Sequence, residues 1–308
     1  MKKILLWGMG TDYNSLLNQI LFEIQKGNIT VKGIVCRNED IYCDYKDGFK
    51  VVVKDKISSI DYDYIIITGL NHYSQIVHEA LQLGIPREKI IHGKLLHYPY
   101  FDFKKYCSLR ENPVTILSDD CWGGYVYDRL DLPFSSPLIN IYWDGEEYAR
   151  FIENPIFYLN TDLKIEREGN LKKGIFPIAS LGDGINKVEL QLVHNSCFEE
   201  ALEQWNRRIK RINFNNMFVK MGFSSNIDAL KKEKCISSFN ATSYKKILFY
   251  YGDEKINDAF KTERFFVEEL KNKRVEMFNY NDYLRLNYFW DMDLFNLLLY
   301  GKDYSRIM

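Results

Sequence analysis

The fold of the first part of the chain is decided by the stretch Ile4-Leu5-Leu6-Trp7-Gly8-Met9-Gly10, an apolar run that passes into two glycines. Asp12 is expected to cap a following helix, because apolar residues then recur every three to four positions from Leu16 to Ile24. Gly27 is expected to end this helix, since glycine readily adopts the left-handed conformation found beyond helix C-termini. A strand, a glycine turn and an amphipathic helix in this order indicate a parallel α/β sheet.

The same alternation of strands and helices continues to about residue 110. Further strands are expected at 29–35, 51–53, 64–67 and 90–91, a helix around 76–83, and a connecting helix at 103–109. Asn112-Pro113 marks a boundary, because these residues favour turns. We therefore predict a Rossmann-like, parallel-sheet domain over residues 1–111 and a second α/β domain over residues 112–308.

The second part has its own alternating series. Strands are expected at 114–117, 138–143, 188–193, 217–221 and 247–251, and helices at 146–159, 198–212, 260–271 and 291–299. A further amphipathic stretch at 125–130 opens a helix directly after the polar segment that follows the strand at 114–117.

Composition narrows the class of protein. With 308 residues the chain exceeds the usual size of one compact core. The 41 basic and 42 acidic residues nearly balance, which argues against a nucleic-acid partner. No apolar run approaches the ~20 residues of a membrane span. Six scattered cysteines without an export signal indicate reduced thiols. These features together predict a cytoplasmic protein.

Gly8 and Gly10 suggest a nucleotide site, because glycines between a strand and a helix let the backbone approach a pyrophosphate. The third glycine of that fingerprint would fall at position 13, which is Tyr13, and this counts against an NAD-linked oxidoreductase. A nucleotide sugar or another small phosphorylated molecule is an equal candidate. The alternative is that both glycines only form the turn.

Cys121 and His194 form a more specific candidate site than the two glycines do. Each follows the C-terminal end of an expected strand, so the two would meet at one rim if both strands were parallel in one sheet. That geometry is typical of a cysteine nucleophile with a histidine base. Against it, Asp119 and Asp120 lie beside the thiol and disfavour its thiolate, and a free cysteine is often buried and inert.

The two aspartates beside Cys121 have candidate roles of their own. Asp120 or Asp119 could act as a general base or hold a divalent ion, or either could cap the next helix. A zinc site from His194, Cys197 and Cys121 matches no standard spacing, so no metal site is expected. The rest of the loop is expected to shape a substrate pocket: Ser118, Asp119, Trp122, Gly123 and Gly124.

Basic side chains are concentrated in the expected helix at 198–212. Arg207, Arg208 and Arg211 are spaced to share a face, and guanidinium groups suit phosphate or carboxylate. Asn140, after another expected strand, could orient the substrate. The alternative for the arginines is a solvated helix face beside a buried Trp205.

Residues 112–300 resemble an uncharacterised bacterial family of exopolysaccharide biosynthesis proteins. The resemblance rests on the ordered stretches Asp120-Cys121-Trp122-Gly123-Gly124, Ser136-Pro137-Leu138-Ile139-Asn140, Phe176-Pro177, Val193-His194 and Trp205 with Arg208, Arg211, Ile212 and Asn213. Asp120 departs from that family, which usually has Asn there. The N-terminal part separately resembles small Rossmann-like domains attached to sugar-modifying enzymes, on Gly84-Ile85-Pro86 and Glu88-Lys89-Ile90.

These resemblances imply an α/β fold and a role in making or modifying a surface glycan. The expected function is an acyl-type transferase acting on an activated sugar or glycan precursor, with His194 as base. The alternative is a non-catalytic module that binds a sugar nucleotide or supports assembly.

Overall fold

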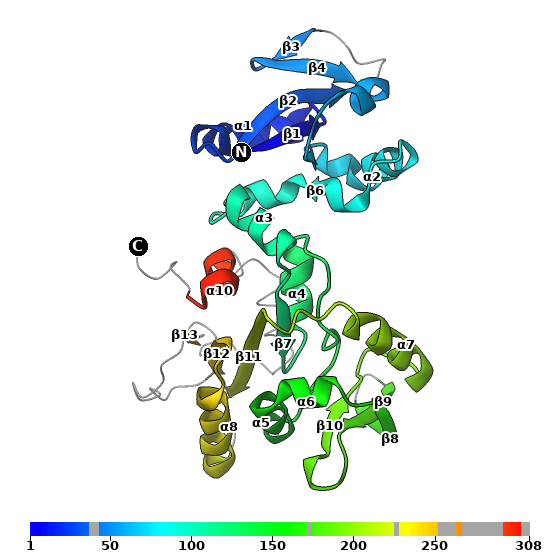
Figure 1. Ribbon diagram of the computed structural model, residues 1–308, viewed down its shortest axis with the longest axis vertical. Coiled ribbons are helices and arrows are strands. Elements are labelled where there is room, and N and C mark those ends of the chain that lie inside the picture. The colour runs from blue at the N-terminus through cyan, green and yellow to red at the C-terminus, as the bar shows by residue number, and fades with distance from the viewer. Residues whose placement is uncertain (37–42, 172–173, 225–227, 252–262, 267–291, 303–308) are drawn as a thin grey trace. The chain divides into compact units, whose positions relative to one another are not determined.

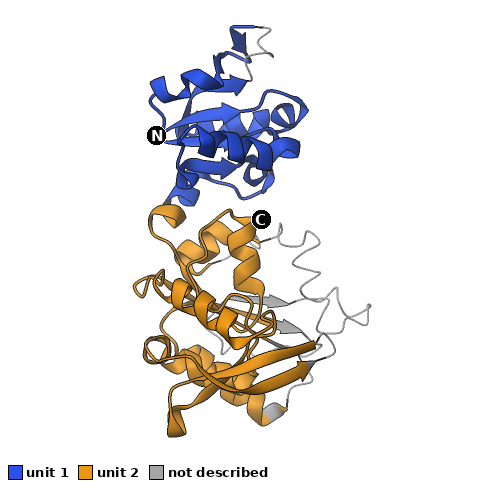
Figure 2. Ribbon diagram, turned by 90° about the vertical axis from the view of Figure 1, so that its right-hand side faces the viewer, with its two compact units in different colours: residues 1–107 blue, residues 108–308 orange. Residues whose placement is uncertain are grey.

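The computed structural model describes residues 1–36, 43–171, 174–224, 228–251, 263–266 and 292–302 (Figure 1). The chain divides into two compact units, Met1–Cys107 and Ser108–Met308 (Figure 2). Helices alternate with parallel strands in both units, so the predicted α/β class is confirmed. Within the described ranges no helix is long and apolar enough to cross a membrane.

Unit 1 is built on a parallel sheet in the order β4-β2-β1-β5-β6, as predicted for a Rossmann-like domain. Its strands are β1 Lys2–Trp7, β2 Ile29–Cys36, β4 Phe49–Val53, β5 Tyr64–Ile67 and β6 Ile90–His92, with the short β3 Tyr45–Lys46 antiparallel to β4. The chain runs outward from β1 to β2 and β4, then returns to place β5 on the other side of β1. This reversal makes β1 the switch point of the sheet.

Helices and short 3₁₀ turns connect these strands or follow the last of them, and the final helix extends beyond Cys107. They are α1 Thr11–Gln25, η2 Lys54–Ser59, η3 Leu70–His72, α2 Tyr73–Gln82, η4 Arg87–Lys89, η5 Gly93–His97 and α3 Phe103–Glu111. Gly27 ends α1 with φ +71°, as predicted. The expected cap Asp12 is wrong, because Gly10 is the N-cap and Asp12 lies in the first turn. Its carboxylate instead accepts hydrogen bonds from the Asn71 backbone N–H and side-chain amide.

One carboxylate is fully buried inside unit 1. Glu23 on α1 accepts hydrogen bonds from Asn28 Nδ2 at 2.6 Å, Phe103 N at 3.1 Å and Gln19 Nε2 at 3.2 Å. It joins the end of α1 to the start of β2 and to the start of α3. A buried charge is tolerated where its oxygens have donors, as they have here.

The described residues of unit 2 form two separate sheets. A parallel sheet has the order β13-β12-β11-β7, and an antiparallel sheet has the order β10-β9-β8. The strands are β7 Thr115–Ser118, β8 Lys164–Leu171, β9 Gly174–Leu181, β10 Val188–Gln191, β11 Met217–Ser224, β12 Lys245–Tyr251 and β13 Glu263–Phe266. The helices are α4 Trp122–Arg129, α5 Gly145–Glu153, α6 Pro155–Leu159, η6 Gly184–Asn186, α7 Phe198–Ile209, α8 Ala229–Ala241 and α10 Leu294–Tyr300.

One apolar core serves both sheets of unit 2. Leu117 and Leu248 contribute to it from the parallel sheet, and Leu190 contributes from β10. Trp143 and Trp205 belong to the same buried cluster. The antiparallel sheet is therefore packed against the same core as the strands that carry the polar loop after β7, and this brings the C-terminal ends of β7 and β10 into one region.

Several predicted elements of unit 2 differ from the structure. Residues 137–140 form turns, and beyond them only Tyr142 pairs with a strand residue, in an isolated bridge, so the strand expected at 138–143 is wrong. The helix expected at 146–159 is broken at Asn154-Pro155, because Asn154 Oδ1 caps a second helix that begins with the proline. Of the helix expected at 260–271, residues 263–266 form β13, and the others lie outside the described residues.

Candidate functional site

The thiol of Cys121 and the imidazole of His194 face each other. The Sγ of Cys121 lies 3.3 Å from Nε2 of His194, although the two residues are 73 positions apart. Cys121 is the N-cap of α4 and is partly exposed, and His194 is exposed in the turn after β10. The prediction that these two side chains meet is confirmed.

The two side chains do not meet at the rim of one parallel sheet, so that part of the expectation is wrong. β7 belongs to the parallel sheet, whereas β10 is antiparallel to β9 in the other sheet. Residues 138–143, for which a strand was expected, connect the two sheets instead. Trp143 N donates to the carbonyl of Asp119 at 3.0 Å, while Tyr142 and Gln191 exchange two backbone hydrogen bonds of 2.9 Å. These contacts hold the end of β7 beside the end of β10, three residues before His194.

A buried lysine lies between the two aspartates. Lys220 on β11 is fully buried, and its Nζ donates to Asp119 Oδ1 at 2.7 Å and to Asp120 Oδ2 at 2.6 Å. The same ammonium lies 5.6 Å from the ring centroid of Phe249, on the adjacent strand. Its buried charge is thus met by two carboxylates and an aromatic face.

The remaining carboxylate oxygens also have donors. Asp119 Oδ2 accepts from the backbone N–H of Gly222 at 2.7 Å. Asp120 Oδ1 accepts from Trp122 N, the first amide of α4, at 2.9 Å and from Ser118 Oγ at 3.1 Å. Asp120 therefore fixes the start of α4, in agreement with the capping alternative. The general-base role expected for Asp120 or Asp119 stays a prediction.

This cluster changes the electrostatic argument about Cys121. Burial raises the pKa of Asp119, the Lys220 ammonium lowers it, and the Asp120 carboxylate raises it, with a net increase. Burial lowers the pKa of Lys220, but the two carboxylates outweigh this, so the pKa is raised and the lysine stays protonated. The two negative charges expected beside the thiol are thus offset in part by one ammonium.

Sequence reasoning missed Lys220, although a signal was present. The residue interrupts the apolar run Met217-Phe218-Val219 and Met221 of a strand that is covered on both faces. A lysine at such a position is almost never buried without a carboxylate partner. The nearest candidates were the two aspartates after the neighbouring strand.

The other residues expected in the loop serve packing. Trp122 is fully buried and stacks on Phe218, with a centroid distance of 6.1 Å, so it does not contact a substrate as predicted. Gly123 and Gly124 also lie against neighbouring side chains. A Cβ at Gly123 would approach Ile116 Cγ2 at 3.1 Å, and one at Gly124 would approach Ile139 Cγ2 at 3.3 Å. The glycines let α4 pack closely, and Ser118 is buried beneath them.

The three arginines of α7 differ in their surroundings. Arg208 is half-buried, and its Nη1 donates to the carbonyl of Ile139 at 3.0 Å. Burial lowers the pKa of Arg208, and the charges of Arg207 and Arg211 lower it further. Arg207 and Arg211 themselves are exposed. Arg208 thus has a structural partner, and the expected role of the three arginines in holding phosphate stays a prediction.

Asn140 also has a local structural role. Its φ of +66° places it in the left-handed region, directly after the carbonyl that Arg208 binds. Asparagine tolerates this conformation better than most residues do. The residue thus turns the chain toward the bridge at Tyr142, and its side chain is partly exposed. As for metals, Cys197 is exposed, and in the described part of the chain no three His, Cys, Asp or Glu side chains converge to hold an ion.

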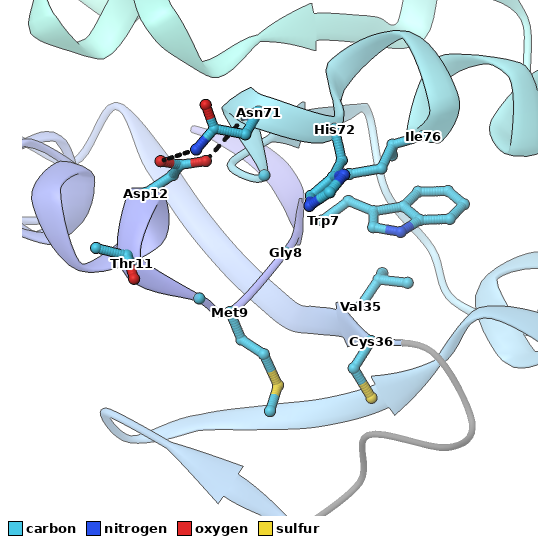
Figure 3. A pocket seen from close by; sticks show the side chains of 12 residues that line it. Trp7, Gly8, Met9, Thr11, Asp12, Val35, Cys36, Asn71, His72 and Ile76 are labelled. Atoms are coloured by element: carbon cyan, nitrogen blue, oxygen red, sulfur yellow. Dashed lines mark hydrogen bonds between the residues drawn. The ribbon is translucent and has the colours of Figure 1, made fainter.

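A cavity of about 500 Å³ lies in unit 1 at the C-terminal ends of β1, β2 and β5 (Figure 3). Its lining residues are Trp7, Gly8, Met9, Gly10, Thr11, Asp12, Val35, Cys36, Gly69, Asn71, His72 and Ile76. The two predicted glycines are both in this lining. Tyr13, at the position of the third fingerprint glycine, is fully buried in the core.

The two glycines of this cavity differ in what they face. Gly8 has φ +120°, and a Cβ there would lie 2.6 Å from the Gly69 backbone nitrogen. Its missing side chain therefore lets the turn after β1 pack against the turn after β5. Gly10 has an ordinary φ of −86°, and a Cβ there would have nothing within 4 Å.

Comparison with known proteins matches both parts of the chain to family models. The model described as "C2185-like, N-terminal" matches residues 1–91, and the model described as "Domain of unknown function (DUF1919)" matches residues 92–299. An uncharacterized protein of Haemophilus influenzae is 26% identical over 188 residues, which cover 60% of this chain and 84% of that protein.

These findings correct the resemblance inferred from the sequence. None of the three descriptions refers to exopolysaccharide synthesis or to sugar-modifying enzymes, so the expected membership in an exopolysaccharide biosynthesis family is wrong. The second family model spans well over half of the chain. The chain belongs to the family described as "Domain of unknown function (DUF1919)".

Proposed function

We propose that this protein is a cysteine-dependent acyltransferase, with Cys121 as nucleophile and His194 as general base. The observation that carries the proposal is the 3.3 Å contact between Cys121 Sγ and His194 Nε2, made by a partly exposed thiol and an exposed imidazole. A thiol within hydrogen-bonding reach of an imidazole is the arrangement that thiol nucleophiles require. A cysteine kept only for packing is usually buried away from titratable groups.

The reaction has two halves that balance. In the first, His194 takes the proton from Cys121, the sulfur attacks the carbonyl carbon of an acyl donor, and the leaving group departs with that proton. In the second, the acceptor gives its proton to His194 and attacks the acyl-sulfur carbon. The carbon–sulfur bond then breaks, and the proton returns to the thiol.

The surroundings of Cys121 support this role. It occupies the N-cap of α4, where the positive end of the helix dipole favours negative charge on the sulfur. The first-turn amides of a helix lack intrahelical acceptors and can also stabilise a developing oxyanion. Asp120, held by Lys220, fixes the start of α4 and thereby the position of the thiol.

The expectation of a sugar or glycan acceptor depended on the corrected family resemblance and stays a prediction without other support. The proposal therefore concerns the acyl-transfer chemistry of the Cys121–His194 pair.

The proposal is tested by acylating the full chain with p-nitrophenyl acetate and locating the acetyl group by peptide mass spectrometry. We expect Cys121 to be acetylated first, and His194→Ala to slow that acetylation by about 100-fold or more. Cys197, exposed in the same unit, is the matched control thiol. Equal rates at Cys121 and Cys197, or a rate at Cys121 that His194→Ala leaves unchanged, would contradict the proposal.

A further inference from the structure

We propose that the cavity of unit 1 binds a nucleoside monophosphate, with the phosphate beside Gly10 and Thr11 and the base along the apolar wall. This inference concerns a different unit from the thiol site and does not depend on the acyltransferase proposal.

The position of the cavity supports a ligand site. It lies beyond the C-terminal ends of parallel strands at the point where the strand order reverses around β1. Open α/β sheets place their ligands at this point, because the loops on the two sides of the reversal diverge there. A volume of about 500 Å³ is within the usual range for small-molecule sites.

The lining has a polar end and an apolar end. Figure 3 shows Thr11 and Asp12 on one side, at the start of α1, and Trp7, Val35 and Cys36 on the other. A phosphorylated sugar next to a flat aromatic base has the same division. Trp7, Val35 and Cys36 are buried and close that side of the cavity, so the base contacts mainly the accessible side chains of Met9 and His72. The helix start offers backbone N–H groups for the phosphate.

The glycine at the helix start is unexplained by protein packing. Gly8 is required by the close approach of Gly69, but the space that a Gly10 side chain would occupy is empty. The conformation of Gly10 suits any residue, since its φ is −86°. Gly10 is exposed and lines the cavity, so we expect a side chain there to narrow the cavity and the approach to the first turn of α1.

Asp12 does not block this approach. Its carboxylate is turned to Asn71, which donates to it from the backbone at 3.0 Å and from the side chain at 3.2 Å (Figure 3). These hydrogen bonds hold the negative charge on the side of η3 and partly compensate it. They also fix Asn71 and the neighbouring His72 at the rim of the cavity.

A dinucleotide fits the site less well than a mononucleotide. In dinucleotide-binding folds the pyrophosphate crosses the crevice between the two strands at the reversal. Here the turns after β1 and β5 are hydrogen-bonded across that crevice. Thr68 Oγ1 donates to Gly8 O at 2.7 Å, and Gly69 N donates to Trp7 O at 3.1 Å. These hydrogen bonds narrow the crossing path, which favours a single nucleoside phosphate over a dinucleotide.

The test is isothermal titration calorimetry of the full chain with AMP, GMP, UMP and CMP, with the four matching nucleosides and with NAD⁺. We expect at least one monophosphate to bind, its nucleoside to bind at least tenfold more weakly, and NAD⁺ to bind no more tightly than that monophosphate. Gly10→Leu is expected to weaken monophosphate binding at least tenfold. Asn18→Leu, on an exposed position of α1 away from the cavity, is the matched control and is expected to leave binding unchanged.

Three outcomes overturn the inference: no binding of any monophosphate, equal affinity for nucleoside and monophosphate, or unchanged affinity in Gly10→Leu. Circular dichroism of both variants shows whether the fold is retained. Binding in Cys121→Ser should equal that of the unaltered chain, and the outcome of the acetylation experiment has no bearing on this one.

Discussion

Lys220 and Ser118 are direct partners across the parallel ladder between β11 and β7. Because Ser118 is the last residue of β7, this register places the lysine ammonium beside the two carboxylates that follow it. The cluster of Lys220, Asp119 and Asp120 thus joins the central strand β11 to the loop that carries Cys121. Its integrity determines where the thiol lies.

Replacing Lys220 by Met should destabilise unit 2 by about 3–5 kcal/mol, because the substitution leaves the buried Asp119 and the partly buried Asp120 without their cation. The measurement is the free energy of unfolding from urea denaturation. Lys231→Met is the matched control, since Lys231 is exposed and its ion pair with Glu146 lies at the surface. We expect no measurable loss for it.

A triple variant separates the missing charge from the missing side chain. Lys220→Met combined with Asp119→Asn and Asp120→Asn removes all three charges, and it should recover a large part of the lost stability. A Lys220→Met chain as stable as the unaltered one, or a triple variant no better than the single one, is incompatible with a charge cluster.

Unit 1 could be predicted closely because its signals are local. The run at residues 4–10, the spacing of apolar residues up to Ile24 and the stop at Gly27 all act within one strand, one turn and one helix. Tyr64-Ile65-Ile66-Ile67 is apolar throughout, as a parallel strand covered on both faces must be. Strand order then follows from the few ways in which such units connect.

Unit 2 was harder to predict because the contacts that determine its fold are made between residues far apart in the sequence. The stretch at 138–143 is as apolar as a strand, but its hydrogen bonds go to Asp119 and Gln191 rather than to a continuous partner strand. The hairpin of β8 and β9 carries exposed polar side chains, such as Glu166 on β8, which accepts from Ser180 Oγ on β9 at 2.6 Å and pairs with Lys187 just before β10, so it lacks the apolar pattern that marks a buried strand.

The candidate site, too, could be predicted from the sequence only in part. The meeting of Cys121 and His194 was predicted from strand ends, but through a sheet that the two strands do not share. Trp122 was placed in the pocket because it lies in a polar loop. The structure buries it instead, since the first turn of α4 faces the sheet.

The pH dependence of stability should report on Cys235 of α8. Burial, with the carboxylates of Glu146 and Asp144, raises the pKa of this thiol from 9.0 to about 11. Above pH 9 the unfolded chain loses this proton while the folded chain keeps it. The associated stability is therefore fully present below pH 9 and is lost as the pH rises through 11. That difference corresponds to roughly 3 kcal/mol.

Between pH 8 and pH 10.5, Cys235→Ala should lose about 2 kcal/mol less unfolding free energy than the unaltered chain does. The measurement is urea denaturation at both pH values. Cys197→Ala, which removes an exposed thiol from the same unit, should keep the full dependence. The assignment is refuted by equal slopes in the Cys235→Ala variant and the unaltered chain.

The arginines of α7 should differ in what they contribute. Arg208 donates to the carbonyl of Ile139 and so anchors the segment that bridges β7 and β10. Arg208→Met should cost about 1–2 kcal/mol of stability, because a half-buried carbonyl loses a charged donor. It should also slow acetylation of Cys121 by loosening the position of His194.

Arg207→Met and Arg211→Met remove exposed charges and should leave both the stability and the acetylation rate unchanged. Urea denaturation and the acetylation rate measure the two effects. A rate equally sensitive to all three arginines would instead indicate that the basic face of α7 attracts the acyl donor.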